Sequence, residues 1–117
     1  MVALDGDMVV AYVDLYNHNP IHRRAEVGLV VQQELRRRGY AKAVLAALDD
    51  LCRDALHLHQ LYCTVRVDNK ASLNLFTHAG YRRCGVLEHW LFEGDAYHDV
   101  VRMQKIISRN EGNNNTY

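Results

Sequence analysis

The spacing of apolar residues predicts two helices separated by strands. Between residues 41 and 55, apolar residues recur every three or four positions with charged residues between them, which is typical of an amphipathic helix. Its apolar positions are Ala41, Val44, Leu45, Leu48, Leu51, Cys52 and Ala55, and its polar side holds Lys42, Asp49, Asp50, Arg53 and Asp54. A second, shorter helix is expected from Lys70 to His78 or Ala79, because Asn69 can cap its start and Gly80 can end it.

The other apolar segments are short, rich in β-branched or aromatic residues, and bounded by turn residues, which predicts strands. They cover residues 1–4, 8–16, 25–31, 61–67, 81–92 and 96–107. Hairpin turns are expected at 5–7 and 93–95, and a further turn at 17–20, which holds the single proline. The order β-β-β-α-β-α-β-β predicts an α/β domain with a mixed sheet in residues 1–107. Residues 108–117 form a polar tail that we expect to be disordered.

Composition narrows the class of protein. A chain of 117 residues with 49% apolar content is long enough for one globular domain with a core. Its formal net charge of zero gives no indication of nucleic-acid binding. No apolar run approaches the roughly 18–20 residues that span a bilayer. The three cysteines, an odd and sparse set without a recognisable signal peptide, predict reduced thiols and a cytoplasmic location. Their spacing from histidines matches no zinc pattern, so no metal is expected.

The junction between the strand at 25–31 and the helix at 41–55 predicts an anion-binding site. Arg36, Arg37 and Arg38 precede Gly39, so positive side chains lie just before the helix. The first N–H groups of a helix are unpaired, and the helix dipole favours an anion there. Gly39 allows a ligand to approach the backbone closely. The spacing is that of neither common nucleotide-binding glycine motif, yet the chemistry suits a pyrophosphate.

Two motifs carry a resemblance to a known family. Arg36-x-x-Gly39-x-Ala41 resembles the Q/R-x-x-G-x-G/A signature of the GNAT N-acetyltransferases, whose loop holds the pyrophosphate of acetyl-coenzyme A (acetyl-CoA). A second segment resembles that family's N-x-x-[SA]-x-x-[LI]-[YF]-x-x-x-G-[FY] pattern at Asn69, Ser72, Leu75, Phe76, Gly80 and Tyr81. It follows a strand, as in the family. Two patterns in the right order are far more specific than either alone.

Two further stretches narrow the resemblance. Residues 19–26 look like the N-x-x-H-R-x-A-E segment of spermidine/diamine acetyltransferases and their ribosomal-protein N-acetyltransferase relatives, and residues 85–103 are similar to the ending of the same group. The resemblance covers nearly all of residues 2–106 but begins at the family's usual second strand. Its first strand and the two helices after it have no counterpart here. We therefore expect an uncovered sheet face and edge, which a homo-oligomer is one way to cover.

The resemblance implies a set of cofactor-binding residues. Val30 and Val31 would offer a backbone N–H to the thioester carbonyl, and Asn69 would both cap its helix and bond the pantetheine amides. The full set is Val30, Val31, Arg36, Arg37, Arg38, Gly39, Tyr40, Ala41, Asn69, Ser72 and Phe76. Glu26 is the candidate base or amine-recruiting group. The alternative for Glu26 is a surface carboxylate paired with Arg23 or Arg24.

Phe76 departs from the family, because many relatives have a tyrosine there that protonates the coenzyme A thiolate. A phenyl ring cannot donate a proton. We expect Phe76 to pack against the pantetheine arm instead. Tyr81 is a candidate for the missing acid, and protonation by water, or no protonation, are the alternatives.

These residues predict an N-acetyltransferase that transfers acetyl from acetyl-CoA directly to a primary amine. The resemblance implies a small-molecule acceptor, a polyamine such as spermidine. No Cys-His or Ser-His-Asp arrangement indicates a covalent enzyme intermediate. One alternative is acetylation of protein N-termini, as in the ribosomal-protein group. The other is a catalytically weak module that binds acyl-CoA, which Phe76 and the absent front elements favour.

Overall fold

The computed structural model describes residues 2–5, 8–31 and 39–108, and the elements follow the predicted order. Their bounds are β1 (Val2–Asp5), β2 (Met8–Asn19), β3 (Arg24–Val31), α1 (Tyr40–Asp54), β4 (Gln60–Arg66), α2 (Lys70–His78), β5 (Arg82–Glu93) and β6 (Ala96–Ile106). Within the described part of the chain, neither helix is long and apolar enough to cross a membrane.

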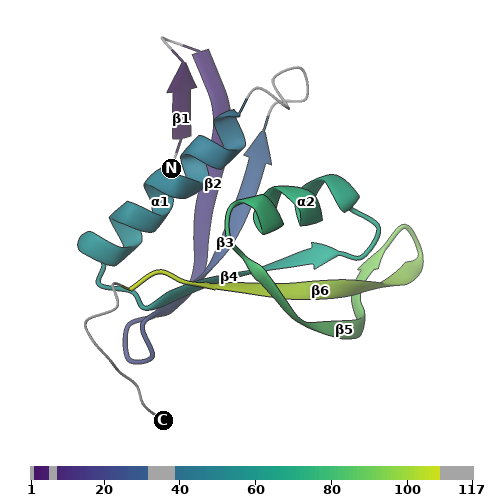
Figure 1. Cartoon of the computed structure of the whole chain (residues 1–117). Coiled ribbons are helices and arrows are strands. Elements are labelled where there is room, and N and C mark those ends of the chain that lie inside the picture. The colour runs from purple at the N-terminus through teal and green to yellow at the C-terminus, as the bar shows by residue number, and fades with distance from the viewer. Residues whose placement is uncertain (1, 6–7, 32–38, 109–117) are drawn as a thin grey trace.

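One six-stranded sheet organises the chain, with strand order β1-β2-β3-β4-β6-β5. β3 and β4 are parallel, and every other neighbouring pair is antiparallel. A parallel pair needs a crossover, and α1 supplies it. Both helices lie on the same face of the sheet, α1 over β2 and β3 and α2 toward β5 (Figure 1). The predicted mixed α/β fold is confirmed.

The core lies between this face of the sheet and the two helices. Along β4, Leu61, Cys63 and Val65 are buried and alternate with half-buried polar residues, as a strand with one covered face requires. α1 contributes Val44, Leu45, Leu48 and Cys52, and α2 contributes Leu73 and Phe76. The opposite face of the sheet carries no helix within the described residues.

The polar side of α1 was predicted wrongly at two positions. Asp49 is 7% exposed, whereas Leu51, placed on the apolar side, is 42% exposed. The Asp49 carboxylate accepts a hydrogen bond of 2.5 Å from the Lys105 ammonium on β6, which also donates to the Ala79 carbonyl at the end of α2. A partner from a distant strand therefore allows a charge to be buried, which helical spacing alone cannot reveal.

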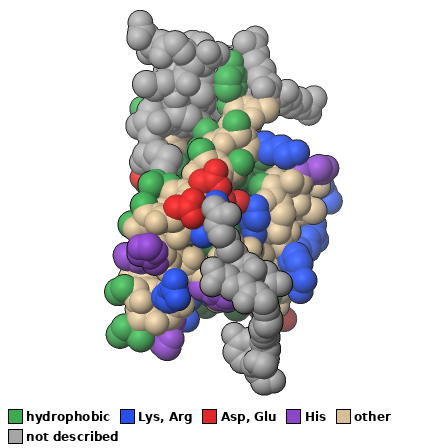
Figure 2. Space-filling view, turned by 60° about the vertical axis from the view of Figure 1, so that its left-hand side comes forward, with side chains coloured by type: hydrophobic (Ala, Val, Ile, Leu, Met, Phe, Trp, Pro, Cys, Tyr) green, Lys and Arg blue, Asp and Glu red, His purple; other side chains and the backbone are tan. Residues whose placement is uncertain are grey.

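The outer charges of α1 pair with each other instead. Arg53 bonds Asp50 at 2.6 Å and Asp54 at 3.1 Å, as neighbours on a helix surface do. Figure 2 brings this end of the molecule forward and shows acidic side chains gathered at one spot beside basic ones. Asp50 and Asp54 are close in sequence to the buried Asp49, but their carboxylates are exposed to water.

Two predicted boundaries also differ from the structure. β2 continues through the predicted turn at 17–20 as far as Asn19, with a register shift between Tyr16 and Asn19 and a positive φ of 52° at Asn17. The bulge at this register shift accommodates the turn-forming residues, so the strand does not end there. At the other end, Ser108 was assigned to the tail, but its hydroxyl lies 2.7 Å from the His59 ring. The rest of the tail and the first hairpin turn at 6–7 lie outside the described residues.

The buried charge pair predicts a large difference between two neighbouring aspartates. Asp49→Ala leaves the half-buried Lys105 ammonium without its carboxylate, so we expect a loss of about 2–3 kcal/mol in the free energy of unfolding. Asp50→Ala, which removes an exposed partner of Arg53, should cost less than about 1 kcal/mol. Urea unfolding of the two variants measures both values. Equal losses would show that the Asp49–Lys105 pair has no special role.

Two buried thiols predict a dependence of stability on alkaline pH. Burial, with a smaller contribution from the Asp49 charge, raises the pKa of Cys52 from 9.0 to about 11. Burial, with a smaller contribution from Glu26, raises the pKa of Cys63 to about 12. Above pH 9 the unfolded chain releases these protons while the folded chain keeps them. The stability they contribute is therefore complete below pH 9 and is lost as the pH rises toward 11–12.

We expect the free energy of unfolding to fall above pH 9 by as much as about 1.4 kcal/mol per pH unit for each thiol. Urea unfolding at pH 8, 9.5 and 10.5 measures this slope. Cys63→Ala removes one of the two thiols and should give a shallower slope than the unaltered chain, even if its stability at pH 8 is lower. The matched control is Cys84→Ala, since Cys84 is exposed. Identical slopes in all three proteins would contradict the assignment.

Candidate functional site

The site begins where β3 and β4 separate. Their parallel pairing joins Arg24 with Gln60, Ala25 with Leu61 and Glu26 with Tyr62, and ends there. Both strands continue on their outer edges, since β3 stays paired with β2 to Val31 and β4 stays paired with β6 to Arg66. The two strands therefore enclose an opening in the middle of the sheet.

A cleft of about 630 Å³, called here the β3–β4 cleft, fills this opening. β3 contributes Val27, Gly28, Leu29 and Val30, β4 contributes Cys63, Thr64, Val65 and Arg66, and the other lining residues are Tyr12, Asp14, Tyr16, Asn69, Ser72, Phe76, Leu91 and Glu93. The volume lies within the range of about 300–1,000 Å³ that is usual for small-molecule sites. The lining combines inner strand edges, an apolar wall and several polar groups.

α2 places three predicted cofactor residues on one side of the cleft. Asn69 is the N-cap of α2, because its side-chain oxygen accepts a hydrogen bond of 3.2 Å from the Ser72 backbone N–H. This confirms the predicted cap and leaves the Asn69 amide NH2 group as a donor. Ser72 lies in the first turn, and Phe76, one turn further on, presents its largely buried ring. The motif spacing therefore brings Asn69, Ser72 and Phe76 together at the cleft.

The start of α1 has the geometry expected of an anion site. Gly39 is the N-cap with φ of 80°, a left-handed conformation that glycine adopts without strain. No side chain of the described residues caps this helix start. The first N–H groups of a helix have no partner within the helix, so this start can present N–H groups to an anion. The predicted residues Arg36, Arg37 and Arg38 lie outside the described residues, and only the backbone of Val31 is described.

Glu26 lies at the point where the strands separate. It occupies the last paired position of β3 with β4, and its carboxylate accepts a hydrogen bond of 3.0 Å from the Asn17 amide. Among the described residues it forms no ion pair with Arg23 or Arg24, the alternative considered from the sequence. Glu26 does not line the β3–β4 cleft itself. Its role as base or amine-recruiting group stays a prediction.

Tyr81 is placed in the core, away from the cleft. It is 2% exposed, its ring packs edge-on against Phe76 with centroids 5.0 Å apart, and its buried hydroxyl has no hydrogen-bond partner among the described residues. Burial, followed by the Asp49 charge, raises the pKa of this hydroxyl well above its usual value. A hydroxyl that holds its proton so tightly is a poor donor. The geometry gives no support to Tyr81 as an acid, and that role stays an untested prediction.

Three cleft residues on β2 were not predicted from the sequence. Tyr12, Asp14 and Tyr16 alternate along the strand, so their side chains share one face of the sheet. Tyr16 lies across Gly28 of β3, where a Cβ atom would come within 2.6 Å of the Tyr16 ring. A residue with a Cβ atom at position 28 would therefore force the Tyr16 ring to shift. The alternation at 12, 14 and 16 was the available signal, but nothing in the sequence placed that face beside a cleft.

The lining residues of β4 and the last hairpin form a further polar edge of the cleft. Arg66 bonds Asp68 at 2.8 Å and Glu93 at 2.9 Å, so the end of β4 is tied to the end of β5. Asp14 and Glu93 bring carboxylates to the lining, whereas Phe76, Val65 and Val30 bring apolar surface. The lining therefore combines apolar surface with charged groups, of which Glu93 is paired with Arg66.

Comparison with known proteins identifies relatives with this architecture. A model of the Acetyltransferase (GNAT) family matches residues 1–81. A spermidine N(1)-acetyltransferase of Vibrio cholerae is 30% identical over 107 residues, which cover 88% of this chain and 62% of that protein. The structure of spermidine N-acetyltransferase from Vibrio cholerae in complex with CoA and spermine has a TM-score of 0.80 at 29% identity, over 86% of this chain and 59% of that one. A dodecameric structure of the same enzyme has a TM-score of 0.78 at 29% identity, over 85% and 58%.

The family match extends over more than half of the chain and includes β1 to α2, which contribute all of the cleft lining except Leu91 and Glu93. The chain spans 62% of the length of the Vibrio relative. The resemblance inferred from the two motifs is confirmed by the family match and by the similar fold. The chain belongs to the GNAT acetyltransferase family.

Proposed function

We propose that this chain is an acetyl-CoA-dependent N-acetyltransferase whose acceptor is a primary amine of a polyamine such as spermidine. The observation that carries the proposal is the β3–β4 cleft, which opens between two parallel strands and is walled by Asn69, Ser72 and Phe76. The family match and the spermidine acetyltransferase relatives support the reaction and the acceptor class.

Three parts of the chain would hold acetyl-CoA. The first turn of α1, at Gly39, Tyr40 and Ala41, offers N–H groups to the pyrophosphate. The Asn69 amide and Ser72 offer hydrogen bonds to the pantetheine amides. The inner edge of β3 at Val30 and Val31 offers a backbone N–H to the thioester carbonyl, where negative charge develops during attack.

The acceptor must lose a proton before its nitrogen can attack the carbonyl carbon. The C–N bond then forms, the C–S bond breaks, and the thiolate leaves. Glu26, at the point where the strands separate, is the proposed base or recruiting group. The cleft lining carries two carboxylates, Asp14 and Glu93, and one guanidinium, Arg66, which is bonded to Glu93. The remaining negative charge favours a polycationic acceptor over a neutral one.

The cleft cysteine supports direct transfer to the amine. Cys63 lines the cleft, but burial raises its pKa to about 12, so its thiol stays protonated at neutral pH. A protonated thiol is a poor nucleophile. An acetyl-cysteine intermediate is therefore disfavoured at this position.

The proposal includes self-association of the chain. Trp90, Phe92 and Tyr97 on the β5–β6 hairpin are 56%, 61% and 63% exposed. Phe92 packs on Tyr97 with ring centroids 5.0 Å apart, and His89 stacks on the same tyrosine. Exposed aromatic clusters of this kind mark interaction surfaces. The dodecameric relative supports a second copy of the chain as the partner.

A catalytically weak acyl-CoA-binding module is the second candidate function. The observation that favours it is Phe76, which occupies the cleft without a proton to donate. Acetylation of protein N-termini is a further alternative within the same reaction class. Both are decided by activity measurements with defined acceptors.

The decisive experiment measures release of the coenzyme A thiol from acetyl-CoA with spermidine, spermine, putrescine and a set of N-terminal peptides. Turnover with polyamines supports the proposal, and turnover with peptides alone would assign the chain to N-terminal acetylation. Glu26→Gln should lower kcat/KM for spermidine by about 100-fold, as loss of a general base does. Glu88→Gln is the matched control, because Glu88 is exposed on β5 outside the cleft lining. If folded Glu26→Gln keeps full activity, Glu26 is not the base.

A single added hydroxyl tests the role of Phe76. Phe76→Tyr adds a phenol hydroxyl that can donate a proton at the cleft wall, so we expect a higher kcat with little change in KM for acetyl-CoA. Phe76→Leu keeps an apolar side chain without the hydroxyl and should not raise kcat. Steady-state kinetics of the two variants separate proton donation from packing. A Tyr variant no faster than the unaltered chain would show that thiolate protonation does not limit turnover.

A further inference from the structure

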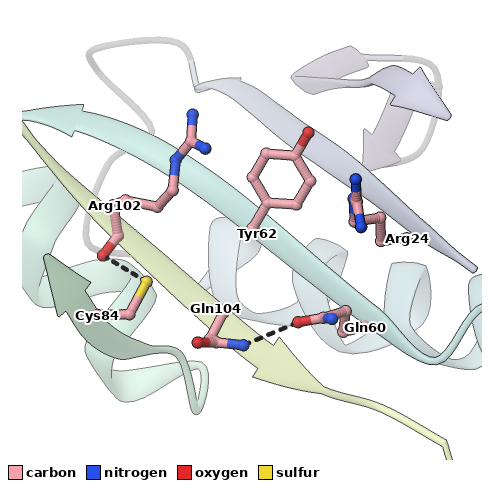
Figure 3. Close-up of a pocket in the computed structure, with 6 residues that line it drawn as sticks. All are labelled: Arg24, Gln60, Tyr62, Cys84, Arg102 and Gln104. Atoms are coloured by element: carbon pink, nitrogen blue, oxygen red, sulfur yellow. Dashed lines mark hydrogen bonds between the residues drawn. The ribbon is translucent and has the colours of Figure 1, made fainter. Parts of the chain in front are cut away.

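A second pocket lies on the face of the sheet that carries no helix among the described residues. It has a volume of about 250 Å³ and is lined by Arg24, Gln60, Tyr62, Cys84, Arg102 and Gln104 (Figure 3). The strands β3, β4, β5 and β6 each contribute at least one of these residues. None of them lines the β3–β4 cleft, so the two cavities share no lining residue. We call it the Arg24–Arg102 pocket.

The charge in this pocket is entirely positive. Two of its six lining residues are arginines, and none is an aspartate or glutamate. Neither Arg24 nor Arg102 forms an ion pair with any residue that the structure describes. Two guanidinium groups without carboxylate partners on a sheltered surface create a local potential that attracts anions.

The arrangement of the side chains leaves donors for a ligand. Arg102 lies over the Tyr62 ring, 5.1 Å from its centroid, and Figure 3 shows Arg24 on the other side of the same ring. Packing against the ring holds the Arg102 guanidinium in place. Its Nε atom is buried and has no hydrogen-bond partner among the described residues. The Arg102 Nη2 atom donates to the Thr64 hydroxyl at 3.4 Å, so among the described residues the guanidinium keeps further N–H groups in addition to its charge.

The amide side chains of the pocket add further donors. The side-chain amide of Gln104 donates a hydrogen bond of 2.8 Å to the side-chain oxygen of Gln60, a pair that Figure 3 shows between β4 and β6. This bond uses one N–H group of the Gln104 side chain. The amide NH2 of Gln60, which accepts the bond through its oxygen, keeps its own N–H groups. An excess of donors over acceptors, together with two guanidinium groups, is the chemistry that recognises carboxylate and phosphate.

We propose that the Arg24–Arg102 pocket is a binding site for a small oxyanion, a dicarboxylate or a phosphate. Each arginine can form charge-assisted hydrogen bonds with oxyanion oxygens, and the glutamine amide can bond a remaining oxygen. The volume is below the usual range for larger ligands, about 300–1,000 Å³, which limits the occupant to a small molecule. The site does not depend on acetyl transfer, so it stands or fails separately from the proposed function.

The test is a titration of the 15N-labelled chain with sodium succinate and, separately, with sodium phosphate. Sodium chloride keeps the ionic strength constant, and the amide signals of the first turn of α1 are followed separately, so that phosphate bound there is distinguished from phosphate in the pocket. We expect saturable shifts of the Gln60, Tyr62, Arg102 and Gln104 amide signals. Saturation with succinate alone identifies carboxylates, saturation with phosphate alone identifies phosphates, and saturation with both identifies a general oxyanion site.

Variants establish where the anion binds. Arg24→Gln and Arg102→Gln should each weaken binding by about tenfold or more, because each removes a charge-assisted contact. Arg102→Lys keeps the positive charge and should weaken binding less than Arg102→Gln. It also serves if Arg102→Gln does not fold. Arg82→Gln and Arg83→Gln are matched controls, since both arginines are exposed on β5 outside the pocket.

Two results would overturn the proposal. One is a set of shifts that sodium chloride alone reproduces, because they would report ionic strength and not a site. The other is that folded Arg24→Gln and Arg102→Gln weaken binding no more than Arg82→Gln and Arg83→Gln do. That pattern would show a diffuse response to surface charge.

Discussion

The divergence of β3 from β4 after Glu26 and Tyr62 is the constraint on which the rest of the molecule depends. Each strand remains paired on its outer side, so the opening leaves unpaired backbone groups only on the two inner edges. Buried backbone N–H and C=O groups need partners. A ligand with amide and carbonyl groups can supply them, which makes the opening both a structural cost and a binding site. The sheet tolerates the opening because its outer ladders hold the strands apart.

α2 connects this opening to the sequence that follows β4. The chain leaves β4 at Arg66, turns at Asp68, and begins a helix whose cap, Asn69, faces the cleft. One residue therefore satisfies the helix and contributes to the wall of the site. Phe76 follows on the same side and packs on Tyr81, so the cleft wall continues directly into the core. Changes to this wall will affect stability as well as ligand binding.

Much of the fold was predictable because local patterns agree with the tertiary structure. The element order and most bounds follow from apolar periodicity, and Asn69, Ser72 and Phe76 follow from a contiguous motif on one helix. The residues that were missed depend on distant partners. Asp14 and Tyr16 line the cleft because β3 separates from β4 beside them, and the Tyr16 ring lies over Gly28, the residue that pairs with Asp14. Asp49 is buried because Lys105 lies beside it, 56 positions further along the chain.

The motif also could not reveal the surroundings of each member. Tyr81 fits the family pattern by position, yet its ring is enclosed on the core side of Phe76. A sequence pattern records residue types at a spacing and not the direction in which each side chain points. Glu26 shows the same limit, since its hydrogen bond to Asn17 depends on the bulged end of β2.

The contacts of Lys105 have a consequence for how this chain can change during evolution. Its ammonium donates hydrogen bonds to the Asp49 carboxylate of α1 and to the Ala79 carbonyl at the end of α2, so one cation contacts both helices. A neutral residue at 105 would leave the Asp49 carboxylate buried without a partner, and a neutral residue at 49 would leave the ammonium in the same position. A sequence with only one of the two replacements would be less stable, whereas replacing both residues together avoids this loss of stability. Positions 49 and 105 are therefore expected to covary among descendants of this sequence, although they lie far apart along it.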